Sequence, residues 1–183
     1  MLFRSQLGEV RRMLERLREA EALAERLNDD RRRGRVCSFM VSTLSLLGEL
    51  DEALTSGTRA LEIAEVLGDP ELRILATSFL AHTHYYRGAY ERVVELATDN
   101  LAVLPADRVY EPFGNAVTSL QDRHWLVMSF AQLGRFAEAA EYEAEVIRLA
   151  EPTHQANTVA WADRKSTRLN SSHIQKSRMP SSA

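Results

Sequence analysis

Two histidines are the first residues to test for chemistry. His82 and His84 are two positions apart, so on a helix they point to different sides and cannot chelate one metal ion as an i, i+4 pair can. Cysteine or carboxylate partners at ligand spacing are missing. No Ser/His/Asp or Cys/His set has a spacing that identifies a nucleophile and its base. The sequence therefore predicts no catalytic residue, no metal ligand and no cofactor-binding residue.

Three other features each allow a structural and a functional interpretation. Cys37 is the single cysteine, and its interior-looking position favours a buried, inert thiol in a reducing compartment. The arginine run 31–35 could bind an anionic partner, but the two aspartates before it favour a solvated helix start. Tyr85 and Tyr86 could form an aromatic cage, although packing is the commoner role of such rings.

Glycines at regular spacing reveal the elements that must position these residues. Gly8, Gly48 and Gly88 follow one another at 40 residues, and Gly134 follows after 46. In the same register alanine recurs at Ala20 and Ala60, and similar aliphatic residues recur around it. Self-similarity at this period indicates stacked helical repeats. We therefore expect units that turn at these four glycines.

Apolar periodicity and helix-end signals divide each unit into two helices. We expect helices over about 6–28, 31–47, 50–67, 70–87, 90–103, 117–133 and 136–150, joined by short turns that make neighbours antiparallel. The strongest end signal is Gly68-Asp69-Pro70, with a glycine past one helix, an N-cap aspartate and a proline at the next first position. Residues 104–116 interrupt the rhythm; they could be a binding loop or an insertion that is merely tolerated.

The pattern around the glycines resembles the second half of a tetratricopeptide repeat. Gly48, Leu50, Ala53, Ala60 and Leu61 carry the resemblance best, and the 40-residue unit is longer than the usual ~34 residues. In the third unit Val93 and Asn100 replace the two alanines.

Three further stretches, residues 17–36, 111–126 and 133–138, resemble the extended repeats that follow the ATPase module in bacterial adenylate/guanylate cyclase-like signal-transduction ATPases. That resemblance implies a regulatory segment of a larger protein. The family's enzymatic activity does not carry over, because neither a phosphate-binding Gly-Lys-Ser/Thr loop nor a cyclase carboxylate pair is present.

Composition changes at about residue 163. Residues 1–162 hold 18 Arg, no Lys and 25 acidic residues, whereas residues 163–183 are rich in Ser and basic groups. The latter stretch resembles a translated sequencing adapter, so we interpret it as an artefactual, disordered tail and residues 1–162 as the repeat array. The acidic array argues against direct nucleic-acid binding. The absence of a visible leader or long apolar run favours a cytoplasmic location and no membrane contact.

These observations predict an all-α, right-handed superhelical array of antiparallel helix pairs, which is a tetratricopeptide-like α-solenoid. We expect a non-catalytic protein-interaction or regulatory module, a fragment of a larger bacterial signalling ATPase or cyclase or of a transcriptional regulator. Its expected partner is a protein or peptide, such as an adjacent ATPase module of the same polypeptide. The alternative is a free-standing repeat adaptor or an oligomerisation scaffold. Binding would use the concave surface formed by the first helices. The predicted concave residues are Arg35, Ser38, Ser42, Ser45, Ser78, His82, Tyr85, Gln121, His124 and Met128.

Overall fold

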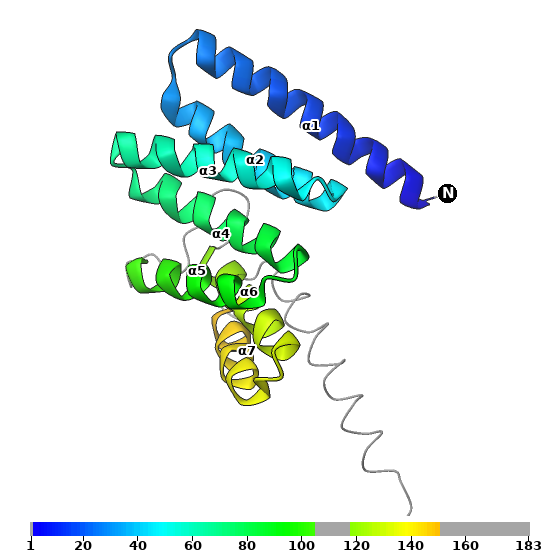
Figure 1. The fold of residues 1–183 in the computed structure, drawn as a ribbon, viewed down its shortest axis with the longest axis vertical. Helices are drawn as coiled ribbons and strands as arrows, with labels where there is room; N and C mark the ends of the chain where they lie inside the picture. The colour runs from blue at the N-terminus through cyan, green and yellow to red at the C-terminus, as the bar shows by residue number, and fades with distance from the viewer. Residues whose placement is uncertain (1, 105–117, 151–183) are drawn as a thin grey trace, which may run out of the picture.

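The computed structural model describes residues 2–104 and 118–150, with side chains from Leu7 onward. Within these ranges the chain forms seven helices and no strand, so the protein is all-α (Figure 1). The helices are α1 (Leu2–Arg26), α2 (Asp30–Leu47), α3 (Leu50–Leu67), α4 (Pro70–Tyr86), α5 (Tyr90–Val103), α6 (Thr118–Gln132) and α7 (Phe136–Ala150). The segment 105–117 and the predicted tail 163–183 lie outside the described residues.

Local chemistry sets the helix ends where the sequence indicated them. Gly68 adopts a left-handed conformation at φ 58°, which favours glycine. The Asp69 side chain then accepts a hydrogen bond from the Leu72 backbone N–H, and Pro70 is the first residue of α4. Asn28 ends the turn after α1 at φ 52°. These end signals are confirmed, and they reverse the chain within a few residues.

Burial repeats with the 40-residue period. Along α3, Ala53, Gly57 and Ala60 are buried, and the equivalent residues of α5, forty positions later, are buried as well. Gly57 shows why the residue must be small, because a Cβ there would lie 2.4 Å from Leu80 Cδ2 of α4. The register that the glycines predicted therefore corresponds to one repeated packing arrangement.

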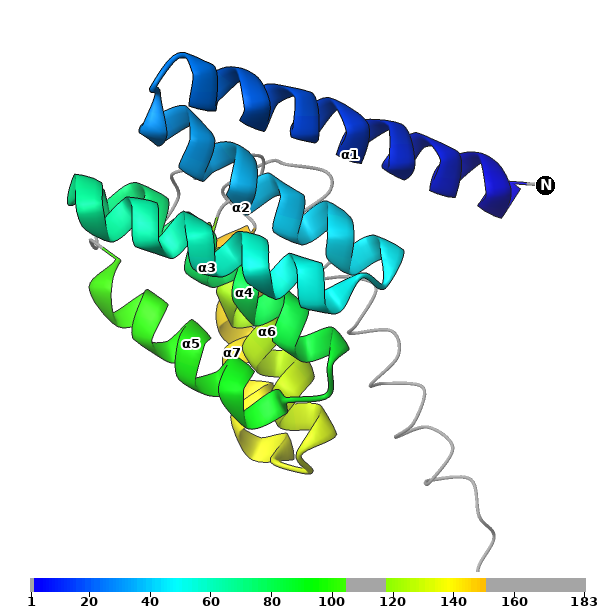
Figure 2. The same ribbon diagram turned by 45° about the horizontal axis from the view of Figure 1, so that its top comes forward.

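The helices pack in order along the array, and Figures 1 and 2 show them stacked from α1 at one end to α7 at the other. Each helix contacts the next one, and the even-numbered helices also contact each other, α2 with α4 and α4 with α6. Helix α4 is thus central, with neighbours on several sides. None of the described helices is long and apolar enough to cross a bilayer.

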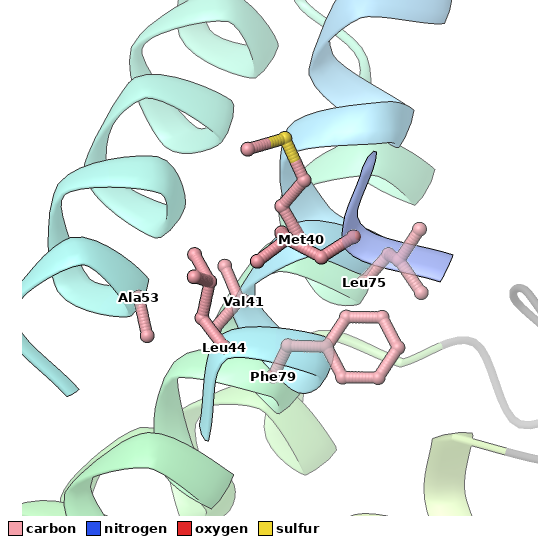
Figure 3. Packing of buried hydrophobic residues seen from close by; sticks show 7 residues of the cluster. Met40, Val41, Leu44, Ala53, Leu75 and Phe79 are labelled. Atoms are coloured by element: carbon pink, nitrogen blue, oxygen red, sulfur yellow. The ribbon is translucent and has the colours of Figure 1, made fainter. Parts of the chain in front are cut away.

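The largest apolar cluster lies where α2 meets its neighbours (Figure 3). Helices α1, α2, α3 and α4 all contribute to it, and burying these side chains supplies the main stabilisation of this end of the array. The members are Leu14, Met40, Val41, Leu44, Ala53, Leu75 and Phe79.

Helix α1 departs from the sequence prediction in two ways. Gly8 lies inside α1, and no turn occurs there. A glycine within a helix costs only about 1 kcal/mol relative to alanine, so it does not by itself force a turn. The apolar periodicity that predicted this helix would also turn its leucines inward. Leu14 is buried, but Leu23 is 47% and Leu27 59% exposed, because among the described helices α1 contacts only α2 extensively.

Candidate functional site

Four of the ten predicted concave residues are buried instead of open to a partner. Ser38, Ser45, Ser78 and His82 are all at most 6% exposed. The reason is that successive even-numbered helices contact each other, so the small residues on their facing sides fill the contact. Ser45 Oγ of α2, for example, lies 2.8 Å from Thr83 Oγ1 of α4. The prediction that these four residues line an open face is wrong.

The other six predicted residues keep some exposure. Arg35 is exposed on α2, and Ser42 of α2 and Tyr85 of α4 are half-buried. Gln121, His124 and Met128 of α6 are also half-buried. The structure brings Tyr85 and His124 together through Trp125, whose ring centroid lies 5.2 Å from that of Tyr85 and 5.0 Å from that of His124.

Trp125 is the centre of a group of rings that we call the aromatic cluster. The cluster joins the C-terminal end of α4, the start of α5 and the middle of α6, and its outermost ring is Tyr86, which is 48% exposed. Such tilted and edge-on ring pairs add stabilisation beyond their buried area. The members are His82, Tyr85, Tyr86, Tyr90, His124 and Trp125.

Two buried rings of the cluster carry polar atoms without a hydrogen bond. His82 stacks on Trp125 with ring centroids 4.6 Å apart, and neither His82 Nδ1 nor Trp125 Nε1 has a partner. Burial lowers the pKa of His82 to about 4, so the imidazole is neutral near pH 7. Burial also raises the pKa of Tyr85, and a hydrogen bond with Gln132 partly offsets this rise.

A second group of buried polar residues escaped the sequence analysis. Asp122 of α6 is 1% exposed, and its Oδ2 accepts a hydrogen bond of 2.6 Å from Asn100 Nδ2 of α5. The same amide nitrogen also donates to the carbonyl of Ile74 in α4 at 3.1 Å. Burial raises the pKa of Asp122 to about 7, while Ser78, Asn100 and Arg123 each act to lower it. The Asn100 amide of α5 thus links α4 to the Asp122 carboxyl group of α6.

The hydrogen bonds around Ser78 differ from those of its equivalent in the preceding unit. Ser38 donates to the carbonyl of Gly34 at 3.0 Å. Forty residues later, the carbonyl of Ile74 accepts from Asn100 instead. Ser78 Oγ makes no hydrogen bond and neither does Asp122 Oδ1, although the hydroxyl lies close enough to the carboxyl group to lower its pKa.

The repeat register contained the signal that points to this pair. Asn100 stands forty residues after Ala60, and Asp122 stands forty-six after Ala76. Ala60 and Ala76 pack together with Cys37 in the earlier unit. Two polar residues in place of two touching alanines indicate a buried polar contact, and comparing both substitutions at once would have found it.

The surroundings of Cys37 agree with its interpretation as a buried, inert thiol. Cys37 is 1% exposed, and its Sγ lies 3.5 Å from Glu21 Oε1. Burial and the nearby Glu21 carboxylate raise its pKa to about 12, so the group stays a thiol near pH 7.

The arginine run is bound by acidic neighbours. Arg31 pairs with Asp69 at 2.7 Å, and Arg33 pairs with Glu25 at 3.3 Å. These contacts support the solvated helix start rather than an anion-binding patch.

Within residues 2–104 and 118–150, no group of three His, Cys, Asp or Glu side chains could hold a metal ion. No protein-family model matches the chain, and the search of curated proteins finds no significant match.

Proposed function

We propose that the chain is a non-catalytic, tetratricopeptide-like module that binds a protein or peptide through the side of the array where α4 and α6 present the aromatic cluster. In this proposal the helix pairs form a right-handed superhelix, and the module belongs to a larger bacterial signalling ATPase or cyclase. The consecutive packing of the helices and their glycine turns support the repeat architecture.

The observation that carries the binding proposal is the partial exposure of the aromatic cluster. Tyr86 is 48% exposed, and Tyr85, Tyr90 and His124 are half-buried beside it. Aromatic side chains that are held rigidly and remain partly accessible are the residues that most often dominate binding energy at interfaces. The buried partners, His82 and Trp125, hold these rings in place.

A binding experiment with the full chain tests this proposal. The immobilised chain is offered a purified ATPase module of the signalling class described above, and retention is compared for the wild type, Tyr86→Ala and Phe136→Ala. Phe136 is a matched control because it is an aromatic residue on α7, 67% exposed and outside the cluster. We expect Tyr86→Ala alone to reduce retention by about tenfold or more. Equal retention by all three proteins would place the binding surface elsewhere.

The exposed side of α1 favours a second candidate, an oligomerisation scaffold. Met13 and Leu23 of α1, and Leu27 just after it, are each 47–59% exposed, and exposed apolar residues that gather into a patch mark association sites. Sedimentation of the full chain over a range of concentrations distinguishes the two candidates. A dimer that Leu23→Glu dissociates would support the scaffold, whereas a monomer at every concentration would exclude it.

A further inference from the structure

The contact between α4 and α6 contains a line of buried polar atoms that make no hydrogen bond. Helix α4 contributes Ser78 Oγ and His82 Nδ1, and α6 contributes Asp122 Oδ1, Trp125 Nε1 and Ser129 Oγ. A buried polar group without a partner opposes packing, because it has lost its hydrogen bonds to water and gained none. Two of these atoms belong to groups that can carry a full charge, His82 and Asp122. His82 stays neutral above about pH 4, so near pH 7 the protonation state of Asp122 has the largest effect on this contact.

The two states of Asp122 fit the contact differently. As a carboxylate it needs donors at both oxygens, but Asn100 Nδ2 supplies one at Oδ2 and Oδ1 has none. As a neutral acid it avoids the cost of a buried charge, and at 1% exposure this cost outweighs the opposing effects of the Ser78 hydroxyl and the Asn100 amide. The contact therefore favours the protonated state.

We propose that Asp122 is a pH-responsive latch that docks the pair α6–α7 onto α4 and α5 when protonated and loosens it when ionised. Ionisation leaves a charge between helices that offer it one hydrogen bond, and the pair α6–α7 can release that charge to water by separating. This proposal stands apart from the binding proposal, because it concerns how the array holds together and requires no partner.

Few polar, charged or titratable side chains act on Asp122. Helix α4 presents Ser78 and, one turn further, the neutral His82, and α5 presents Asn100. On α6 itself the only cation that acts on Asp122 is Arg123, whose Nε is bound by Glu145 of α7 at 2.7 Å. The cation is thus largely neutralised, which is why burial dominates.

The size of the effect follows from the two pKa values. A carboxyl group with a pKa of about 7 when buried and 3.8 when exposed makes separation about 30-fold easier at pH ~8 than at pH ~5.5. Helix α6 also carries His124 and Trp125, so the latch would decide whether the aromatic cluster is assembled.

Amide hydrogen exchange of the full chain tests the latch. Protection factors for α6 and α7 amides are measured for the wild type and Asp122→Asn at pH ~5.5 and ~8. Because His82 also becomes exposed on separation, the comparison uses the ratio of the variant's protection to that of the wild type, in which the His82 contribution cancels. We expect this ratio to rise about 30-fold between the two pH values for α6–α7, and to stay constant for α2–α3.

Asp99→Asn is the matched control, since Asp99 is an exposed carboxylate on α5, and its ratio should not change with pH. A ratio for Asp122→Asn that is independent of pH would overturn the latch, as would equal changes in all helices. Should Asp122→Asn fail to fold, the carboxyl ¹³C resonance of Asp122 in the wild type decides. A titration midpoint near 7 supports the latch, and one below about 5 contradicts it.

Discussion

In the junction between α2, α3 and α4, Ala60 meets Ala76 and Cys37; in the next junction, between α4, α5 and α6, the equivalent positions hold Asn100 and Asp122. The first contact is small and apolar, so its stability depends on close approach alone. The second replaces that contact with a hydrogen-bonded amide and acid. One backbone arrangement therefore accommodates two kinds of junction, and only the second responds to protons.

The largest expected effect comes from breaking the polar junction on one side. Asn100→Ala removes the donor to Asp122 and to the carbonyl of Ile74, so at pH ~8 it should lower the free energy of unfolding by about 3–5 kcal/mol. Urea unfolding followed by circular dichroism measures this change.

The double variant Asn100→Ala/Asp122→Ala sharpens that test, because it turns the polar junction into a copy of the apolar one. Replacing a buried polar pair by apolar residues is often close to neutral, so we expect most of the lost stability to return. If the double variant is as unstable as Asn100→Ala, the pair does not act as a unit.

Removing only the charge of Asp122 should give the next largest effect. The folded-state pKa is raised to about 7 from 3.8, so the folded protein binds more protons than the unfolded one between these values. Stability is therefore full below about pH 4 and is lost as the pH rises through 7. At pH ~8, Asp122→Asn should raise the free energy of unfolding by up to about 4 kcal/mol. At pH ~4 the same substitution should have little effect in the same urea titration.

A packing variant tests the apolar junction in the same way. Ala60 is fully buried, so Ala60→Leu should overfill the contact and cost about 1–3 kcal/mol at every pH between about 5.5 and 8. Thr58→Leu is the control, because Thr58 is exposed on α3 and should change stability little. Similar losses in both variants would show that the two positions are not packed as described.

The smallest effect is expected at His82. Its folded-state pKa is lowered to about 4 from 6.5, so the unfolded chain binds more protons between these values. The contribution of neutral His82 to the free energy of unfolding is therefore complete above about pH 6.5 and is lost as the pH falls through 4. This pH dependence is opposite in direction to that of Asp122. At pH ~5.5 the His82 imidazole should lower the wild type's free energy of unfolding by about 1 kcal/mol relative to pH ~7.5, and His82→Phe should abolish this difference. Thermal unfolding at pH ~5.5 and ~7.5 measures it. A wild-type midpoint that differs between those conditions no more than that of the variant would contradict the assignment.

The sequence predicted best those features that depend on a few neighbouring residues. Asp69 and Pro70 define the start of α4 through one side chain and one restricted dihedral angle, and both are visible in the sequence. The repeat register singled out Ala53 and Ala60 as recurring small residues, and both are fully buried. Each of these features requires information from a single helix end or a single helix face.

The candidate surface was harder to predict because it depends on distances between helices. Ser38 and Ser78 are small and polar, which fits an open face and a tight helix contact equally well, and the structure shows the tight contact. The exposure of Leu23 on α1 likewise depends on which helix covers it. The polar pair at Asn100 and Asp122 was encoded in the register, but each residue is unremarkable when taken alone.

The order of the helix contacts determines how the chain would respond to tension. Every extensive contact between the described helices joins neighbours or next neighbours along the chain, so none of these helices links α1 to α7 directly. Pulled by its two ends, such an array should yield one helix pair at a time in a series of small steps, and should re-form in reverse order when the load is released. Its low contact order also favours rapid refolding. The force at which the array begins to extend would therefore be set by its least stable helix junction.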